Sequence, residues 1–208
     1  MLPGSDLVLV VVPALIWLVW WGRSRFTLRQ LFLRCILVIY VGGVVGVTMF
    51  PLPVQPEWIR DDRNTVRATP GAAIVLYNSI PGASITESIK NAREDARRGI
   101  PLATMLRPLY GNIMLYVPLG YLLPWVWPRW RSWWRVALFL GAAAVAIELI
   151  QLLGDLAYGF PYRRVDIDDV ILNLAGGMVG YGLYCLTRPL LHPHGDSEVS
   201  VPDAAAAE

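Results

Sequence analysis

The stretch that decides how this chain folds is ELIQLLGDLAYGFPYRRVDIDDVILNLAGGMVG, residues 148–180. It contains the end of one apolar segment and the start of another. Polar side chains lie inside both, with Glu148 and Gln151 in the first segment and Asn173 in the second. In hydrocarbon such groups must be paired or must face water, so they are retained for function or for packing that depends on them. The stretch therefore predicts two membrane helices whose polar connection belongs to a site.

Composition places the rest of the chain in a membrane as well. Hydrophobic residues make up 55% of the 208 residues and charged residues only 16%, and the apolar residues occur in long runs. Such runs are typical of membrane helices and not of the short periodic patches of a soluble core. We predict an all-α integral membrane protein, a bundle of five spanning helices at residues 7–21, 35–50, 112–127, 136–153 and 170–187.

The basic residues predict an orientation. Arginines cluster at residues 23–34, at residues 129–135 and at Arg188, positions that share one side of a five-helix bundle. Short Arg-rich loops stay in the cytoplasm, and eight of the nine tryptophans lie near the same side, where indoles sit at the headgroup level. Arg163 and Arg164, on the other side, weakly oppose the rule. We expect a multi-pass protein of the cell membrane, N-terminus outside and C-terminus cytoplasmic.

Two segments lie outside the apolar runs of the transmembrane domain, residues 1–187. The outer loop, residues 51–111, is punctuated by proline, but Ser84 and Glu87 have capping-box spacing before an amphipathic pattern that Gly99 ends. This pattern predicts a short helix on the outer surface, and a solvated charged face is favoured over an anion-binding one. The cytoplasmic tail, residues 188–208, has a composition that predicts disorder.

Charge and cysteine usage exclude other classes. A net charge of +2, with its arginines dispersed along loop ends, does not predict a nucleic-acid partner. Cys35 and Cys185 fall near the cytoplasmic side, where free thiols are expected, and neither has the spacing of a metal or redox motif. We predict no cofactor.

Helical spacing predicts which of the polar residues share one face of a helix. One helix face carries Gly141, Ala144, Glu148, Gln151 and Asp155. The corresponding face of the next helix carries Asp169, Asn173, Gly176 and Gly180. Each face carries small residues at its cytoplasmic end and polar residues at its outer end. The G-x-x-x-G spacing allows the backbones of two helices to approach closely. We expect the two faces to pack together, which brings three polar side chains into contact: Glu148, Gln151 and Asn173.

The expected result is a polar cavity that opens outward. Asn112 and Tyr116 begin the preceding helix and would join it. A buried Glu148 needs a partner, and the nearest cations in the outer loops are Arg107, Arg163 and Arg164. The alternative is a closed hydrogen-bond network that locks three helices, with contacts worth about 0.6 to 2 kcal/mol each. The ionisable Glu148 favours a site.

Catalytic motifs are few. The sequence has no G-x-S-x-G and no H-E-x-x-H, and both histidines lie in the tail. A general base would have to be a carboxylate, with Glu148 the best candidate. Asp166, Asp168 and Asp169 could hold Mg²⁺ or Ca²⁺ through oxygen. The alternative is that they cap the following helix, which accounts for one or two of the three.

Four short elements also occur in a characteristic order: N-S-I-P at residues 78–81, N-I-M-L-Y-V-P-L-G at 112–120, E-L-I-Q at 148–151, and residues 164–180. In these elements the chain resembles the VanZ-like membrane proteins, over residues 78–184. The resemblance implies a polytopic bacterial membrane protein linked, through the family's founding member, to low-level resistance to teicoplanin and related lipoglycopeptides, but no particular reaction. The motif positions are Asn78, Pro81, Asn112, Pro118, Gly120, Glu148, Gln151, Arg164, Asp166, Asp168, Asp169, Asn173 and Gly176.

Our leading hypothesis is that this membrane protein, which is not demonstrably an enzyme, binds an amphiphilic envelope ligand. The ligand would be bound at the outer leaflet, among the membrane lipids. A lipoglycopeptide or a lipid-linked cell-wall precursor would suit. The predicted ligand-binding residues are Asn112, Tyr116, Glu148, Gln151, Arg164, Asp166, Asp169 and Asn173. One alternative is a metal-dependent lipid-head-group enzyme with Glu148 as its base. Another is a structural partner of a second membrane protein, in which the polar residues serve packing alone.

Overall fold

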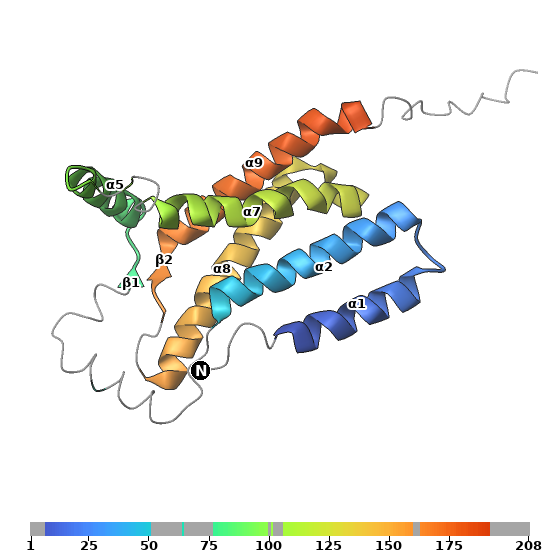
Figure 1. Cartoon of the computed structure of the whole chain (residues 1–208), viewed down its shortest axis with the longest axis horizontal. Helices are drawn as coiled ribbons and strands as arrows, with labels where there is room; N and C mark the ends of the chain where they lie inside the picture. The colour runs from blue at the N-terminus through green and yellow to red at the C-terminus, as the bar shows by residue number, and fades with distance from the viewer. Residues whose placement is uncertain are drawn as a thin grey trace, which may run out of the picture.

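The structure, a computed structural model, describes residues 7–50, 64, 77–99, 101, 106–159 and 163–191. Its longest elements are α1 (Val8–Gly22), α2 (Leu28–Met49), α7 (Arg107–Val126), α8 (Trp133–Tyr158) and α9 (Ile167–Leu191). In Figure 1, α7 and α9 lie side by side, α8 crosses them, and α2 packs on α7 with α1 beyond it. A short 3-10 helix, η2 (Pro128–Arg131), joins α7 to α8.

The predicted helical segments are all helices, and their ends differ from prediction for local reasons. Helix α2 begins at Leu28 because Thr27 and Gln30 form a capping box, in which each side chain accepts from the other's backbone N–H at 3.3 Å. Helix α8 ends at Tyr158, because the next residue, Gly159, has a φ of 72° that suits glycine. Helix α9 continues to Leu191, so the first residues of the predicted tail are helical; residues 192–208 lie outside the described residues.

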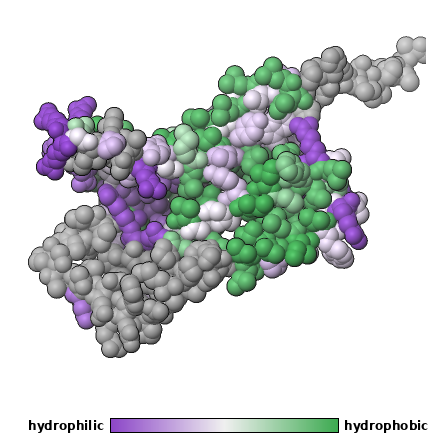
Figure 2. All heavy atoms as spheres, viewed as in Figure 1, coloured by the Kyte–Doolittle hydropathy of each residue, from purple (hydrophilic) through white to green (hydrophobic). Residues whose placement is uncertain are grey.

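Three of the described helices, α2, α8 and α9, are long and apolar enough to cross a membrane. Helix α1 is apolar but shorter, at 15 residues. The outward face of α8 exposes Leu138, Leu149, Leu153 and Leu156, at 52 to 67%. Figure 2 shows hydrophobic surface over the helices and hydrophilic surface at the end that carries α5. An apolar flank of this kind is suited to lipid. The chain is thus helical and membrane-like, while the count of five spans stays a prediction.

The glycines of α9 pack differently from the prediction. A Cβ added at Gly176 or Gly180 would collide with a backbone carbonyl of α7, that of Ile113 or Val117. Gly120 of α7 likewise lies against Gly177. The G-x-x-x-G face of α9 therefore contacts α7, and the predicted pairing of this face with α8 is wrong. Helix α8 packs on the neighbouring side of α9, where Leu140 meets Gly177.

Two short strands were not predicted for an all-α protein. Strand β1 (Tyr77–Asn78) pairs in parallel with β2 (Val165–Asp166), Tyr77 opposite Val165 and Asn78 opposite Asp166. Helix α5 (Ala83–Ala96) follows β1 within the predicted outer loop, where we expected a short amphipathic helix. The strand pair places the start of α5 beside the start of α9, at one end of the bundle (Figure 1). Most of the preceding loop, residues 51–63 and 65–76, lies outside the described residues.

Candidate functional site

A group of polar residues joins β1, α5 and β2 and is called here the strand-end cluster: Asn78, Ser84, Arg164, Asp166 and Asp168. Asp166 is its centre. Its carboxylate accepts from the Asn78 amide at 2.7 Å and from the Ser84 hydroxyl at 2.5 Å, and pairs with Arg164 at 3.2 Å. It also accepts from the backbone N–H of Asp168 at 3.0 Å, which caps α9.

Asp168 caps a different helix. Its carboxylate, 1% exposed, accepts from the backbone N–H groups of Gly82, Ser84 and Ile85 at 2.5, 2.8 and 3.2 Å. These amides belong to the start of α5, where backbone donors have no partner within the helix and a negative charge is favourable. The capping alternative is therefore correct for Asp166, whereas Asp168 caps α5 and not the predicted α9.

These contacts leave little support for a metal at the same carboxylates. Asp166 and Asp168 already accept from N–H and O–H groups, whereas a hard cation needs several oxygens directed at one point. Within the described ranges, no group of three or more His, Cys, Asp or Glu side chains is arranged to hold a metal ion. The strand-end cluster is a structural joint between α5 and the bundle.

A second group lies deeper, between α7, α8 and α9, and is called the inner cluster: Asn112, Tyr116, Glu148, Gln151, Asp169 and Asn173. Glu148, 9% exposed, accepts from the backbone N–H of Asp166 at 2.8 Å. That contact links it to the strand-end cluster. Among the described residues Arg164 pairs with Asp166 and Arg163 donates to the Phe50 carbonyl, so these two arginines have other partners than the predicted Glu148; a contact of Glu148 with Arg107 stays a prediction.

Negative charge gathers around Glu148. The carboxylates of Asp166 and Asp169 and the buried phenol of Tyr116 lie close enough to interact with it electrostatically. Asn112 donates to the Asp169 carboxylate and so ties α7 to α9. Several acceptors thus converge at one end of the bundle with few donors among them. Such a site favours a ligand that brings N–H or O–H donors or positive charge.

Gln151 and Asn173 each leave an oxygen without a partner. The Gln151 amide nitrogen donates at 2.9 Å to the carbonyl of Thr48, in the last turn of α2, and this contact fixes the orientation of the amide. Its Oε1 and the Oδ1 of Asn173 are buried and have no hydrogen-bond partner in the part of the chain that the structure describes. Buried polar atoms without partners are uncommon and call for an explanation, such as a ligand or ordered water.

Asp155, near the end of α8, forms hydrogen bonds that connect neighbouring segments. It accepts from the Tyr77 hydroxyl at 3.3 Å and from the backbone N–H of Arg163 at 3.2 Å. Burial, followed by the charge and the hydrogen bond of Asp155, raises the pKa of Tyr77. Together with the contact between Arg163 and Phe50, these bonds join the ends of α2 and α8 to β1.

The structure brings together most, but not all, of the predicted ligand-binding residues. Asn112, Tyr116, Glu148, Asp166 and Asp169 converge, with Arg164 at the rim. Gln151 turns toward α2, and the outward-opening cavity itself stays a prediction. Sequence reasoning missed the roles of Tyr77, Ser84 and Thr48. The other joint residues had a signal, because they belong to the motif positions of the family resemblance: Asn78, Arg164, Asp166 and Asp168.

The apolar flanks and the buried polar end together define an α-helical membrane protein. The family model VanZ/LLP1 matches residues 37–188, more than half of the chain, so the protein belongs to this family. The match runs from α2 through most of α9 and contains both clusters. It confirms the resemblance expected from the sequence. No curated protein and no solved structure matches the chain significantly.

Proposed function

We propose that this protein binds the polar head of an amphiphilic envelope molecule through the inner cluster, and that it contributes in this way to tolerance of lipoglycopeptides such as teicoplanin. A lipoglycopeptide or a lipid-linked cell-wall precursor is the ligand class that suits it. The apolar part of either molecule would stay in the bilayer, beside the exposed flanks of the helices.

The observation that carries the proposal is the pair of buried, unpartnered oxygens on Gln151 and Asn173. Leaving such an atom without a partner costs about 1 to 3 kcal/mol. A packing role alone would be better served by an apolar side chain at residue 173. A ligand donor that reaches these oxygens removes the cost and gains affinity.

The balance of charge supports a donor-rich head group. Glu148, Asp166 and Asp169 stand together, and the ion pair of Arg164 with Asp166 offsets only part of their charge. Sugar hydroxyls, peptide amides and ammonium groups supply the missing donors. Both lipoglycopeptides and wall precursors carry such groups.

The proposed orientation places this site at the outer leaflet. The opposite end of the bundle gathers the Arg-rich connections: Arg29 lies 5.3 Å from the Trp125 ring centre, and Arg34 donates to the Val126 carbonyl at 3.5 Å. Both Arg-rich connections thus meet at one end, which the positive-inside tendency assigns to the cytoplasm. The N-terminus would then lie outside and the C-terminus inside.

The decisive variant is Asn173→Leu, which replaces the amide that carries the unpartnered oxygen by an apolar side chain of similar size. We expect the free energy of unfolding to stay unchanged or to rise, by up to about 1 to 3 kcal/mol. Binding of teicoplanin or of a lipid-linked wall precursor should weaken at least about tenfold, as the loss of about 1.4 kcal/mol implies. Calorimetric titration and thermal unfolding of the purified full chain measure the two quantities.

Cys185→Ala is the matched control, because Cys185 is an exposed residue of the same helix. It should change neither quantity. Loss of stability in Asn173→Leu, with no ligand bound by the unaltered protein, would favour the structural-partner alternative. If Mg²⁺ stabilised the unaltered protein against unfolding and Glu148→Gln abolished this effect, the alternative of a metal-dependent enzyme would be favoured.

A further inference from the structure

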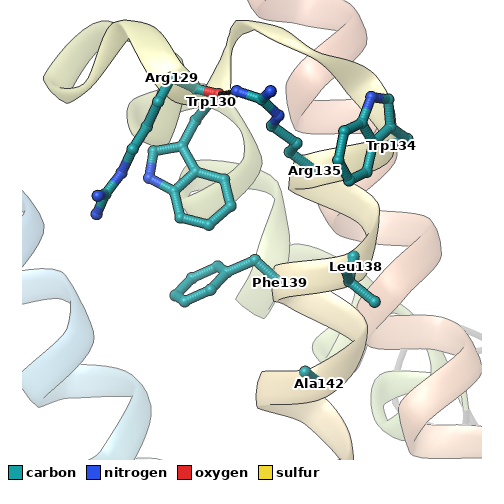
Figure 3. Close-up of a pocket in the computed structure, with 7 residues that line it drawn as sticks. All are labelled: Arg129, Trp130, Trp134, Arg135, Leu138, Phe139 and Ala142. Carbon is teal, nitrogen blue, oxygen red and sulfur yellow. Dashed lines mark hydrogen bonds between the residues drawn. The ribbon is translucent and has the colours of Figure 1, made fainter.

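A pocket of about 510 Å³ lies at the Arg-rich end of the bundle, and the residues that line it are shown in Figure 3. Its head is formed by two arginines and two tryptophans of η2 and the start of α8: Arg129, Trp130, Trp134 and Arg135. Its floor is the outward face of α8, with Leu138, Phe139 and Ala142. The pocket thus changes from cationic to apolar along the helix.

The two arginines are held by their neighbours. Arg135 stacks 5.1 Å from the Trp134 ring centre and donates to the Arg129 carbonyl at 3.3 Å. Arg129 lies 5.5 Å from the ring centre of Trp130. Stacking restrains the guanidinium plane while most of its five N–H donors stay available along the edge. Such donors fit the oxygens of a phosphate.

The start of α8 adds to the attraction for an anion. Trp134 and Arg135 belong to its first turn, whose backbone N–H groups have no acceptor inside the helix. Among the described residues, Ser132 makes no side-chain cap hydrogen bond to this turn. The positive end of the helix dipole therefore lies beside the two arginines.

The apolar floor distinguishes a lipid from a free anion. Leu138 is 67% exposed and Phe139 43%, and Ala142 lies one turn further along α8. A free phosphate would cover none of this surface. An acyl chain that lies along α8 would cover it, and membrane proteins bind anionic lipid head groups in basic pockets on the cytoplasmic side.

We propose that this pocket is a binding site for one anionic phospholipid, with its phosphate at Arg135, positive charge added by Arg129 beyond Trp130, and an acyl chain over Leu138 and Ala142 (Figure 3). The site shares no residue with the inner cluster, so it does not depend on the function proposed above. It would anchor the connection between α7 and α8 at the membrane surface.

Native mass spectrometry of the full chain in detergent tests the site, with phosphatidylglycerol and phosphatidylcholine of the same acyl chains as probes. The unaltered protein should retain one phosphatidylglycerol in preference to phosphatidylcholine. Arg129→Gln and Arg135→Gln should each lower that preference about fivefold, since each arginine near an anionic head group contributes about 1 kcal/mol. Ala142→Phe, which fills the floor but keeps both arginines, should lower retention of the lipid.

Arg25→Gln is the matched control, because Arg25 also stacks on a tryptophan, Trp21, at 4.3 Å and does not line the pocket. It should leave the preference unchanged. An equal loss in Arg25→Gln would show attraction to surface charge alone and overturn the site. So would full retention in Ala142→Phe, or displacement of the lipid by an equal concentration of glycerol phosphate. Thermal unfolding of each variant confirms that it is folded.

Discussion

At the scale of single residues, the three carboxylates of one motif, Asp166, Asp168 and Asp169, have different partners. Asp166 caps its own helix and holds Ser84, Asp168 caps α5 from a distance of more than 80 residues in sequence, and Asp169 binds Asn112. The role of each depends on which donors the fold brings to it. Asp168 is the most buried of the three, at 1% exposed, and accepts from three backbone amides at the start of α5 and, at 3.5 Å, from the Asn78 side chain.

Asp168→Asn should therefore loosen α5. The amide cannot accept three backbone N–H groups as a carboxylate does, and hydrogen bonds to a charged group contribute about 1.5 to 3 kcal/mol each. We expect a loss of at least about 1.5 kcal/mol in the free energy of unfolding and faster hydrogen exchange in residues 83–96. Glu87→Gln, an exposed carboxylate of the same helix, should stay within about 0.5 kcal/mol. Equal hydrogen exchange of α5 in both variants would show that Asp168 does not cap this helix.

At the scale of elements, the contact between α7 and α9 determines how the polar residues meet. Gly176 and Gly180 allow α9 to approach the α7 backbone, and Gly120 does the same from α7. Close approach of backbones is how small residues stabilise helix pairs in lipid, where no hydrophobic force draws helices together. It places Asn112 of α7 within hydrogen-bonding reach of Asp169 on α9.

Gly176→Ala should disrupt this contact, because the added methyl group meets the Ile113 carbonyl, a backbone atom that cannot turn aside. Overpacking of this kind costs about 1 to 3 kcal/mol. Gly182→Ala is the control on the same helix: its Cβ would meet nothing within 4 Å, so it should be neutral or slightly stabilising. Denaturant unfolding in micelles measures both, and an equal effect of the two would contradict the packing.

At the scale of the whole molecule, the two ends of the bundle differ in chemistry. One end carries the acidic clusters and α5, and the other carries arginines stacked on tryptophans. Figure 2 shows the apolar surface between them. A bilayer that covers this surface would leave one end on each side, and the arginine distribution then assigns the sides.

Thiol labelling in intact cells tests this orientation. In a background with Cys35 and Cys185 replaced, a cysteine at Asn91, exposed on α5, should react with an impermeant reagent. One at Ser24, exposed between α1 and α2, should react only after the cells are permeabilised. The reverse pattern would place the inner cluster at the cytoplasmic leaflet.

The sequence by itself determined the helices, the membrane character and the family. These depend on long apolar runs and on local signals, such as the capping box at Thr27 and Gln30, which act within one or two turns. It also pointed to Glu148, Asn112 and Asp169, because an ionisable or amide group is rare in an apolar run.

Only the tertiary structure decided which partners these residues have. Spacing shows that Gly176 and Gly180 share a face but not which helix meets it, and that helix is α7. Nothing local shows that Asp168 would cap α5 or that Asp166 would offer its N–H to Glu148. These contacts follow from a strand pair of two residues on each side, too short to leave a pattern in the sequence. Partners far apart in the chain are chosen by the packing of the whole bundle, which no local pattern encodes.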